Sequence, residues 1–276
     1  MPAFALFVIV ALVALPSLAL ACGGTDRACA VQGGTYHALL PETAEGAPLV
    51  VFLHGAGGSG ARSAANASFV AGFTARGVAL ALPSGEPFAI GGGGGDWGVR
   101  DGIVSPRDDV VFLTRVIEDA VNRFGLDPDR VLIAGFSRGG SMAWDFACAA
   151  PDRIAGLAAV AGGFWEPMVT TCAAPVHLIH THGFADRTVP LEGRQGVFRG
   201  VDFHQGNILK GLDVWRDVNG CPGAAAVSTE AALWRKTWQD CRAGSITLLL
   251  GPGGHGIPQG WTAAVLDWFE ALPPKP

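Results

Sequence analysis

The feature that most constrains the fold is the motif G-F-S-R-G at residues 135–139, which has the pattern G-x-S-x-G. It follows the apolar run Val131–Ala134, typical of a buried strand, and opens the segment Arg138–Ala149, whose pattern predicts a helix. A serine at such a strand-to-helix turn needs strained backbone angles, and the flanking glycines let neighbouring chain approach closely. The motif therefore predicts a strand–turn–helix unit that presents Ser137. The alternative is a chance match in a glycine-rich chain.

Strand-like and helix-like segments alternate along the rest of the chain. Strands are predicted at Tyr36–Leu40, Leu49–Leu53, Val78–Leu82, Val131–Ala134, Ile154–Val160, Pro175–Thr181 and Ile246–Leu250, and helices at 62–75, Val110–Phe124, Arg138–Ala149 and Trp261–Leu272. This alternation predicts an α/β fold, a mostly parallel sheet with helices on both faces. Residues 83–107, which contain five consecutive glycines, predict a long irregular loop, and Gly183–Ser245 shows no assignable pattern. We expect residues 22–276 to form a single domain.

The amino terminus indicates export. Residues 4–21 are almost wholly apolar and end in Ala19-Leu20-Ala21, which fits signal-peptidase cleavage before Cys22. We therefore predict a signal peptide at residues 1–21 and a secreted protein, extracellular or periplasmic. Two alternatives place the protein at a membrane. The apolar run is nearly long enough for an uncleaved anchor, and no basic residue precedes it, while a lipid on Cys22 is the second alternative.

The cysteines support the same compartment. An even number remains after cleavage, as expected for disulfides in an oxidising environment. Proximity along the chain favours the pairs Cys22–Cys29, Cys148–Cys172 and Cys221–Cys241, although sequence alone does not decide among the possible connectivities. Buried free thiols in a cytosolic enzyme are the alternative.

Composition excludes two broad classes of protein. With 49% hydrophobic and 16% charged residues, the chain has the opposite balance from a disordered protein. Its 19 basic and 24 acidic residues give a formal net charge of −5, and no basic stripe occurs, which argues against nucleic-acid binding. No stable protein partner is predicted.

Candidate partners for Ser137 follow it in the chain. A nucleophilic serine needs a base, and the base needs an orienting carboxylate. Asp186 lies in PVHLIHTHGFADRTVP after a predicted strand, and His255 lies in GPGGHGIP after another. The order Ser, Asp, His is typical of hydrolases with this serine motif, and the carboxyl ends of parallel strands bring such loops together. Glu192 and Asp202 are alternative acids, but neither directly follows a convincing strand.

The other histidines have plainer interpretations. His54 ends a strand and is expected to brace the following turn. His180 and His182 form an H-x-H pair that could ligate a metal, but no third ligand occurs at a recognisable spacing, so no metal is predicted. We expect structural or surface roles for the remaining histidines.

The glycine-rich turn Gly55–Gly60 has two interpretations. It satisfies G-x-G-x-x-G after a strand, which is typical of a dinucleotide-binding turn. However, the acidic residue expected at the end of the next strand is missing, because that strand ends at Leu82-Pro83 and Glu86 lies beyond it. The other interpretation is an oxyanion loop whose backbone N–H groups point at a carbonyl oxygen. We favour the oxyanion loop because it alone uses Ser137.

Together these segments carry a family resemblance. VVFLHGAGGSG, DDVVFLTRVIEDAV, LDPDRVLIAGFSRGGSMA, HTHGFADRTVP and GGHGIP resemble the secreted polyhydroxybutyrate depolymerase and feruloyl esterase group of the α/β-hydrolases, over about residues 28 to 272. The resemblance implies an α/β-hydrolase fold and a serine esterase with Ser137, Asp186 and His255 as its catalytic triad. It implies an oxyanion hole formed by the backbone N–H groups of Ala56 and Arg138. The sequence departs from the group's usual pattern at Arg138, where a small residue is common, and at Gly256, where a polar residue is common.

The substrate is the least constrained part of the prediction. Trp97 and Trp165 both follow predicted strands and are candidate pocket residues, with core packing as the equal alternative. We expect an ester substrate, either a hydroxyalkanoate oligomer or a phenolic plant ester, and no cofactor. Acetylxylan-type or general short-chain carboxylesterase activity is the alternative. Two further classes stay open, an NAD-binding oxidoreductase built on the Gly55–Gly60 turn and a non-catalytic surface protein on the same fold.

Overall fold

The computed structural model of the protein describes residues 22–87, 94–99, 102–198, 200–230 and 232–273. The predicted signal peptide at residues 1–21 lies outside these ranges. Within the described chain, none of the helices combines the length and the apolar character that crossing a membrane requires.

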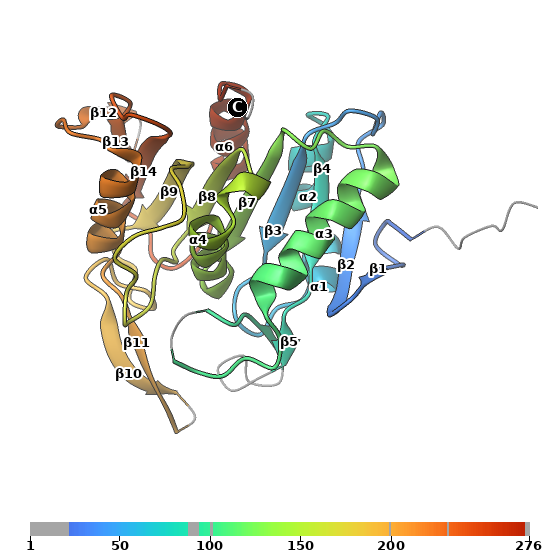
Figure 1. Cartoon of the computed structure of the whole chain (residues 1–276), viewed down its shortest axis with the longest axis horizontal. Coiled ribbons are helices and arrows are strands. Elements are labelled where there is room, and N and C mark those ends of the chain that lie inside the picture. The colour runs from blue at the N-terminus through green and yellow to red at the C-terminus, as the bar shows by residue number, and fades with distance from the viewer. Residues whose placement is uncertain (1–21, 88–93, 100–101, 199, 231, 274–276) are drawn as a thin grey trace, which may run out of the picture.

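A ten-stranded sheet forms the centre of the molecule, with the strand order β1-β2-β4-β3-β7-β8-β9-β14-β13-β12 (Figure 1). The strands are β1 (Cys29–Val31), β2 (Gly34–Leu39), β3 (Leu49–Leu53), β4 (Ala79–Pro83), β7 (Val131–Phe136), β8 (Gly156–Val160), β9 (His177–Gly183), β12 (Ala226–Glu230), β13 (Leu233–Trp238) and β14 (Ser245–Gly251). Neighbours from β4 to β14 pair in parallel, and the outer strands pair antiparallel. The predicted, mostly parallel sheet is confirmed.

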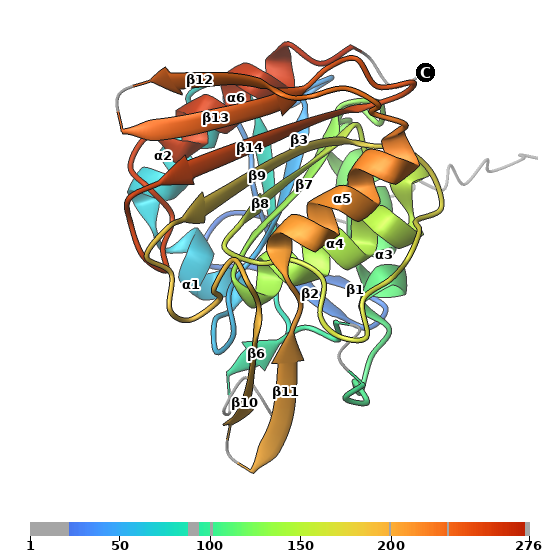
Figure 2. The same ribbon diagram turned by 90° about the vertical axis from the view of Figure 1, so that its left-hand side faces the viewer.

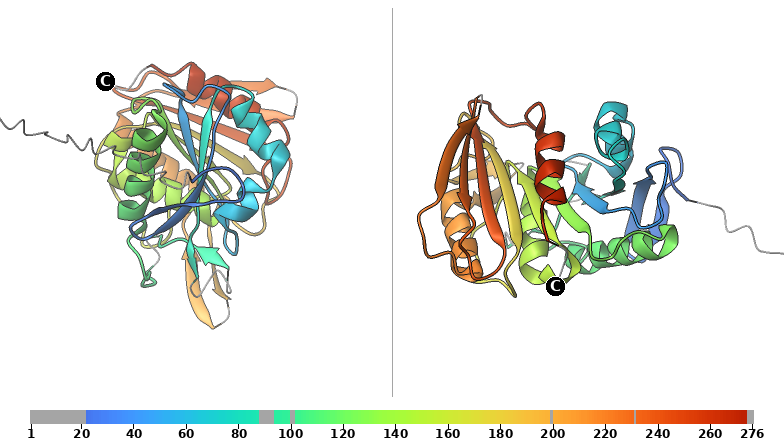
Figure 3. Two further views of the ribbon diagram at one scale, coloured as in Figure 1. Left: turned by 90° about the vertical axis from the view of Figure 1, so that its right-hand side faces the viewer. Right: turned by 90° about the horizontal axis from the view of Figure 1, so that it is seen from above.

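Helices cover both faces of this sheet (Figure 2). One face carries α3 (Asp109–Phe124), α4 (Arg138–Ala149) and α5 (Ile208–Asn219), and the other carries α1 (Gly60–Ala64), α2 (Ala67–Thr74) and α6 (Trp261–Glu270). Seen from above, the red α6 and the cyan α2 lie together, opposite the green α3 and α4 (Figure 3). Strands such as β3, β4 and β8 are buried along their whole length, which explains their continuous apolar sequences.

Local capping sets the helix boundaries. Asp108 caps α3 by accepting a hydrogen bond from the N–H of Val111, and Gly125 ends the helix at a φ of 65°. The helix predicted over residues 62–75 is instead two helices. Asn66 interrupts it, because its side chain caps α2 by accepting from the N–H of Phe69.

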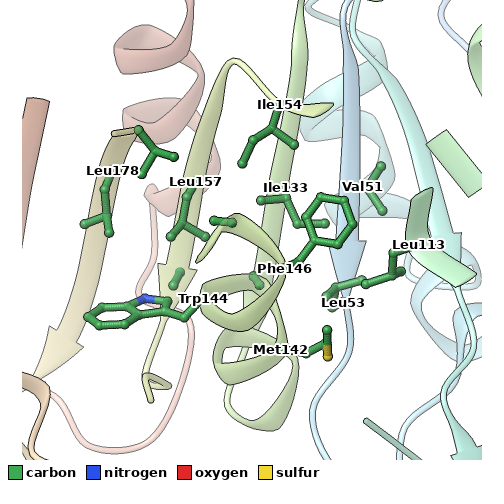
Figure 4. Close-up of a cluster of buried hydrophobic side chains, with 14 of the residues drawn as sticks. Val51, Leu53, Leu113, Ile133, Met142, Trp144, Phe146, Ile154, Leu157 and Leu178 are labelled. Atoms are coloured by element: carbon green, nitrogen blue, oxygen red, sulfur yellow. The ribbon is translucent and has the colours of Figure 1, made fainter. Parts of the chain in front are cut away.

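The larger hydrophobic core lies between the sheet and α3, α4 and α5 (Figure 4). Trp144 and Phe146 of α4 pack with Ile133 of β7 and Leu157 of β8, and all four side chains are fully buried. A second core on the opposite face anchors α2 and α6 through Phe73 and Phe269. Burying an aromatic or branched side chain contributes about 1.5–3 kcal/mol, so these layers hold the sheet that positions the site.

The structure contains the three disulfides that proximity along the chain favours: Cys22–Cys29, Cys148–Cys172 and Cys221–Cys241. The second ties the end of α4 to the segment before β9, and the third ties the end of α5 to the segment before β14. These two disulfides join segments on the face of the sheet that carries the larger core.

Two small hairpins lie outside the central sheet. Glu86–Pro87 (β5) pairs with Gly95–Asp96 (β6) inside the segment predicted to be an irregular loop. Arg194–Phe198 (β10) pairs with Val201–Gln205 (β11), and this hairpin projects from one end of the molecule in Figures 1 and 2. With α5, β12 and β13, it fills the stretch from Gly183 to Ser245 for which the sequence shows no pattern.

Candidate active site

Ser137 sits on a sharp turn between β7 and α4. Its φ of 57° and ψ of −122° fall in a region that residues with a side chain rarely adopt. The surrounding structure holds this conformation, since the N–H of Ser137 donates to the carbonyl of Val160 over 2.8 Å. The turn places the hydroxyl at the carboxyl end of the sheet, as the G-x-S-x-G pattern predicts.

The glycines of the motif make this turn sterically possible. A Cβ on Gly135 would collide with the carbonyl oxygen of Gly139, and a Cβ on Gly139 would collide with that of Leu53. Gly162, in the segment after β8, packs in the same way against the carbonyl of Ser137. The turn is therefore enclosed by backbone on several sides, and a side chain at these positions would displace the serine.

Asp186 and His255 meet Ser137 from two neighbouring loops. His255 follows β14, and its Nε2 lies 2.9 Å from Ser137 Oγ. Asp186 follows β9, and its Oδ2 lies 2.8 Å from His255 Nδ1. The hydrogen-bond network fits the tautomer in which Nδ1–H donates to Asp186 and Nε2 accepts from the serine hydroxyl. The structure thus brings together the three residues that the sequence selects, in one hydrogen-bonded chain.

Backbone contacts hold the two loops in register. The N–H of Phe184 donates to Gly251 O, and the N–H of Ala185 donates to Gly253 O. Asp186 itself is 5% exposed, and its Oδ1 accepts from the N–H groups of Thr188 and Val189 at 2.9 and 2.8 Å. The carboxylate is therefore fixed on one oxygen by the backbone and presents the other to His255.

Two buried histidines lie beneath this carboxylate. His182 Nε2–H donates to the carbonyl of Val189 over 2.7 Å and lies 3.5 Å from Asp186 Oδ2. His180 Nε2 and His182 Nδ1 are hydrogen-bonded at 3.0 Å, and the ring of His180 packs edge-on against Trp144. The histidine pair thus contacts the loop that carries Asp186 through His182, at the carbonyl of Val189 and at the Asp186 carboxylate. Among the described residues, no group of three or more His, Cys, Asp and Glu side chains is arranged to hold a metal ion.

We expect the free energy of unfolding to fall as the pH drops below about 6.5, the usual pKa of histidine in an unfolded chain. Burial lowers the pKa of His180 well below that value, and it also lowers the pKa of His182 and of His54. The folded state then stays neutral while the unfolded state binds protons, so this stability is present above pH 6.5 and is lost below it. Each such histidine adds a slope of about 1.4 kcal/mol per pH unit.

Denaturant titrations across this pH range measure that slope. His180→Gln removes one of the buried imidazoles. The free energy of unfolding of this variant should therefore depend less on pH than that of the native chain, by about 1.4 kcal/mol per pH unit. A free energy of unfolding that stays constant down to about pH 5 would contradict this account.

The glycine-rich turn lies beside the serine. Ala56 of this turn and Arg138 of α4 line a pocket of about 200 Å³ together with Ser137. Arg138 is the first residue of α4, where backbone N–H groups have no partner within the helix and the helix dipole favours negative charge. The two residues whose backbone N–H groups the resemblance implies for an oxyanion hole therefore line the same pocket as Ser137.

His54 braces the glycine-rich turn, as the sequence predicts. Its Nδ1–H donates to the carbonyl of Gly55 over 2.8 Å, and its Nε2 accepts from the N–H of Gly85 over 3.0 Å. Across the turn, Gly58 forms a β-bridge with Gly95. These contacts fix the turn that carries Ala56.

The two tryptophans expected in the pocket have different positions. Trp165 lines the pocket beside Ser137, and its indole N–H donates to Ser141 Oγ over 3.0 Å. Trp97 is 0% exposed, and its indole N–H donates to the carbonyl of His54 over 2.7 Å. The expectation that Trp97 lines the pocket is therefore corrected. Trp97 anchors its loop in the larger core, and its ring centre lies 4.9 Å from that of His54.

The sequence does not identify the rest of the pocket lining. Arg194 of β10 and Phe203 and Gln205 of β11 line the pocket beside Trp165, which forms a β-bridge with Gln205. The rings of Trp165 and Phe203 are 5.9 Å apart, and the Arg194 guanidinium lies 5.1 Å from the centre of the Phe203 ring. Phe203, between the polar residues Asp202 and His204, is the available signal, but its position beside Ser137 depends on the tertiary fold.

Comparison with known proteins shows what the chain is similar to. Residues 108–197, which include Ser137 and Asp186 but not His255, match the model of the phospholipase/carboxylesterase family. The chain is 34% identical over 154 residues to "Putative esterase NocK" of Nocardia uniformis subsp. tsuyamanensis, covering 55% of this chain and 44% of that protein. It is 25% identical over 157 residues to feruloyl esterase C of Emericella nidulans, covering 55% and 52%. The chain spans about half the length of these curated relatives.

Solved structures extend the likeness across most of the chain. The acetyl xylan esterase from Aspergillus awamori has a TM-score of 0.63 at 15% identity, covering 86% of this chain and 94% of that one. The Bacillus cereus carboxylesterase has a TM-score of 0.58 at 12% identity, covering 87% and 94%. The protein has the α/β-hydrolase fold. Within that fold it resembles the esterase group.

Proposed function

We propose that the protein is a serine hydrolase of carboxylic esters, with Ser137 as nucleophile, His255 as general base and acid, and Asp186 as the orienting carboxylate. The observation that carries the proposal is the hydrogen-bonded chain from Ser137 Oγ through the His255 ring to Asp186 Oδ2. Relatives named as esterases and the esterase-like fold support it. Neither a metal nor an organic cofactor takes part.

The geometry supports a two-stage reaction. Ser137 Oγ attacks the ester carbonyl while His255 Nε2 accepts the hydroxyl proton, and Asp186 stabilises the resulting imidazolium. The carbonyl oxygen becomes an oxyanion facing the backbone N–H groups of Ala56 and Arg138. Collapse of this intermediate expels the alcohol, which takes the proton from His255. Water, activated by the same nitrogen, then releases the acid from the acyl-serine.

The pocket favours an aromatic acyl group. Trp165 and Phe203, whose ring centres are 5.9 Å apart and whose planes are tilted by 56°, form one aromatic surface beside Ser137, with Val189 in the same pocket, and a planar acyl group would pack against this surface. A second hollow of about 340 Å³ shares Ala56 with the pocket and carries Ser59, Arg62 and Asn66, which suit an alcohol that bears hydroxyl groups. We therefore propose phenolic esters of hydroxylated alcohols as substrates, ahead of hydroxyalkanoate oligomers and acetylated xylan.

A comparison of three substrates tests this order of preference. We expect kcat/KM for methyl ferulate to exceed the values for a hydroxybutyrate oligomer and for acetylated xylan. An apolar pocket separates related acyl groups by about 1–3 kcal/mol, so differences of about tenfold or more are the expected scale. A clear preference for acetylated xylan would reject the aromatic assignment while keeping the esterase. No hydrolysis of any ester would reject both.

Trp165→Ala should raise KM for methyl ferulate by about tenfold, because it removes one aromatic wall worth about 1.5 kcal/mol. KM for a short acetyl ester should change less than about threefold, since that acyl group is too small to cover this aromatic surface. Trp268→Ala is the matched control, because Trp268 of α6 packs against the second core, away from the pocket. Equal changes in KM for both esters would show that Trp165 only supports the fold.

We also propose that the protein is exported. The apolar segment that ends before Cys22 and the three disulfides support this localisation. Export is compatible with an ester substrate found outside the cell.

A further inference from the structure

We propose that the buried ion pair between Arg138 and Asp96 positions the oxyanion hole, because it ties the nucleophile turn to the glycine-rich turn. This inference rests on the proposed esterase function. It concerns the two side chains, whereas the hole itself is formed by the backbone N–H groups of Ala56 and Arg138. Arg138 would thus have two separate roles, one for its backbone and one for its guanidinium group.

The Arg138 side chain extends from the nucleophile turn into the protein interior. Its Nε lies 3.0 Å from Asp96 Oδ1, and its Nη2 donates to the carbonyl of Trp97 over 3.1 Å. The side chains of Arg138 and Asp96 are 2% and 0% exposed. The guanidinium also lies 4.5 Å from the centre of the Trp165 ring, on the pocket wall. The planar group is therefore held by a carboxylate, a carbonyl and an aromatic face at once.

The segment that receives this guanidinium is joined directly to the glycine-rich turn. The N–H of Gly57 donates to Gly95 O over 2.8 Å, and the N–H of Gly95 donates to Gly58 O over 3.0 Å. Beyond Asp96, the indole N–H of Trp97 donates to the carbonyl of His54 over 2.7 Å. The segment around Asp96 is thus attached on both sides to the residues that flank Ala56.

Close packing leaves this connection little freedom. A Cβ on Gly94 would collide with the carbonyl oxygen of Gly57, and the N–H of Trp97 donates to Asp96 Oδ1 over 2.8 Å. Asp96 Oδ1 therefore receives both the Arg138 guanidinium and its own neighbouring backbone. A displacement of Asp96 would be transmitted to the turn that carries Ala56.

The pair links two donors that belong to different elements. Ala56 lies after β3 and Arg138 lies after β7. The last paired residues of these two strands are Leu53 and Gly135, so strand pairing alone does not fix the distance between Ala56 and Arg138. Stabilising an oxyanion requires both donors at hydrogen-bond distance from one oxygen, and a misplacement of about 1 Å can cost about a hundredfold in rate. The ion pair provides a second connection between the nucleophile turn and the glycine-rich turn, in addition to the strand pairing. Buried ion pairs contribute little net stability, so we assign this one a geometric role.

A neighbouring anchor keeps the test specific. Asp109 Oδ2 accepts from the N–H of Gly98 over 2.6 Å, and Asp109 Oδ1 accepts from Arg107 Nε over 2.7 Å. The segment after Trp97 therefore has its own attachment to α3. Removing the Arg138–Asp96 pair should loosen the connection to the glycine-rich turn without releasing this anchor.

The test uses the full chain with Asp96→Asn and with the double variant Asp96→Asn/Arg138→Met. The double variant removes both charges of the pair, so neither stays buried without the other if the single variant fails to fold. Arg130→Met is the matched control. Arg130 also donates to two carbonyls, those of Phe269 and Leu272, and lies 4.6 Å from the centre of the Phe269 ring, but on the opposite face and away from Ser137.

The measurements are kcat and KM for a short p-nitrophenyl ester, the Kd of an alkylboronic acid, and Tm. The boronic acid forms a tetrahedral adduct with an activated serine, and its oxygen occupies the place of the oxyanion. We expect both Asp96 variants to lose about 10- to 100-fold in kcat, with KM within about threefold. The boronate should bind more weakly by a similar factor. Arg130→Met should lower Tm and keep kcat within about threefold.

Two results would overturn the inference. One is an Asp96 variant or double variant that keeps the native kcat and boronate affinity, since the pair would then only support the fold. The other is an equal loss of kcat in Arg130→Met, which would show a general effect of stability. If the native chain itself neither hydrolyses the ester nor binds the boronate, the proposed function fails first, and this outcome is distinguishable from both.

Discussion

Ser137→Ala should lower kcat/KM for ester hydrolysis by about four to six powers of ten, while the protein remains folded. The substitution removes the nucleophile and the hydroxyl that lies 2.9 Å from His255 Nε2, but it leaves the turn and its packing intact. Binding and the oxyanion hole remain, so the residual rate should still exceed that of water alone. Steady-state kinetics on p-nitrophenyl esters, with thermal unfolding measured on the same preparation, test this expectation.

Ser68→Ala is a suitable control because Ser68 is an exposed serine of α2 whose hydroxyl donates only locally, to Asn66 Oδ1. Its kinetics should match those of the native chain. Native activity in Ser137→Ala would mean that another residue performs the attack. A collapse of Tm in Ser137→Ala would mean that the loss reflects the fold instead of the chemistry.

Asp186→Asn should lower kcat by about 10⁴-fold through the tautomer of His255. Asp186 Oδ1 accepts two backbone N–H groups, and an asparagine would direct its carbonyl oxygen to the same donors. Its amide nitrogen would then face His255 Nδ1, which would have to accept a hydrogen bond instead of donating one. The proton would move to Nε2, the atom that must take the proton of Ser137, so general-base catalysis would be blocked.

Glu192→Gln and Asp202→Asn are the matched controls for this prediction, because both are acidic residues downstream of Ser137 in the sequence. Each should keep kcat within about threefold, since neither is hydrogen-bonded to His255. A large loss in one of them, together with an active Asp186→Asn, would transfer the orienting role to that residue. The pH profile of kcat/KM should keep its shape in the control variants.

Much of the scaffold could be predicted because it is specified locally. The strand before Ser137, the glycines around it and the helix after it each have a signature within a few residues, and the structure gives the steric reason for each glycine. The buried parallel strands were predictable from continuous apolar runs. Asp186 and His255 were selectable because each follows such a strand, and parallel strands bring their carboxyl ends together.

The features that the sequence did not reveal depend on contacts between distant segments. The hairpin β10–β11 and the edge strands β12 and β13 are short and partly exposed, so their residues lack the apolar periodicity on which prediction relies. The apolar pattern predicts one helix over residues 62–75, whereas Asn66, a residue type favoured at helix N-caps, begins a second helix there. Trp97 could equally have lined a pocket or filled the core, and only its tertiary contacts decide this.

The Arg138–Asp96 pair illustrates the same limit. Arg138 was noticeable as an unusual residue within the G-x-S-x-G motif, but nothing local connects it to an aspartate that follows a run of glycines. The two residues are 42 positions apart and meet only because Asp96 and Trp97 contact the Arg138 side chain in the folded chain. Asp186 is also buried but follows a recognisable strand, whereas the Arg138–Asp96 pair has no such local signal.

Labelling with a fluorophosphonate, followed by intact-mass measurement and peptide mapping, tests the central claim most directly. Only a serine activated by a neighbouring base reacts rapidly with this probe. We predict one phosphonyl group per chain, located on Ser137, and loss of labelling in His255→Ala. An adduct on a different residue, or no adduct on the folded native chain, would contradict the proposed triad.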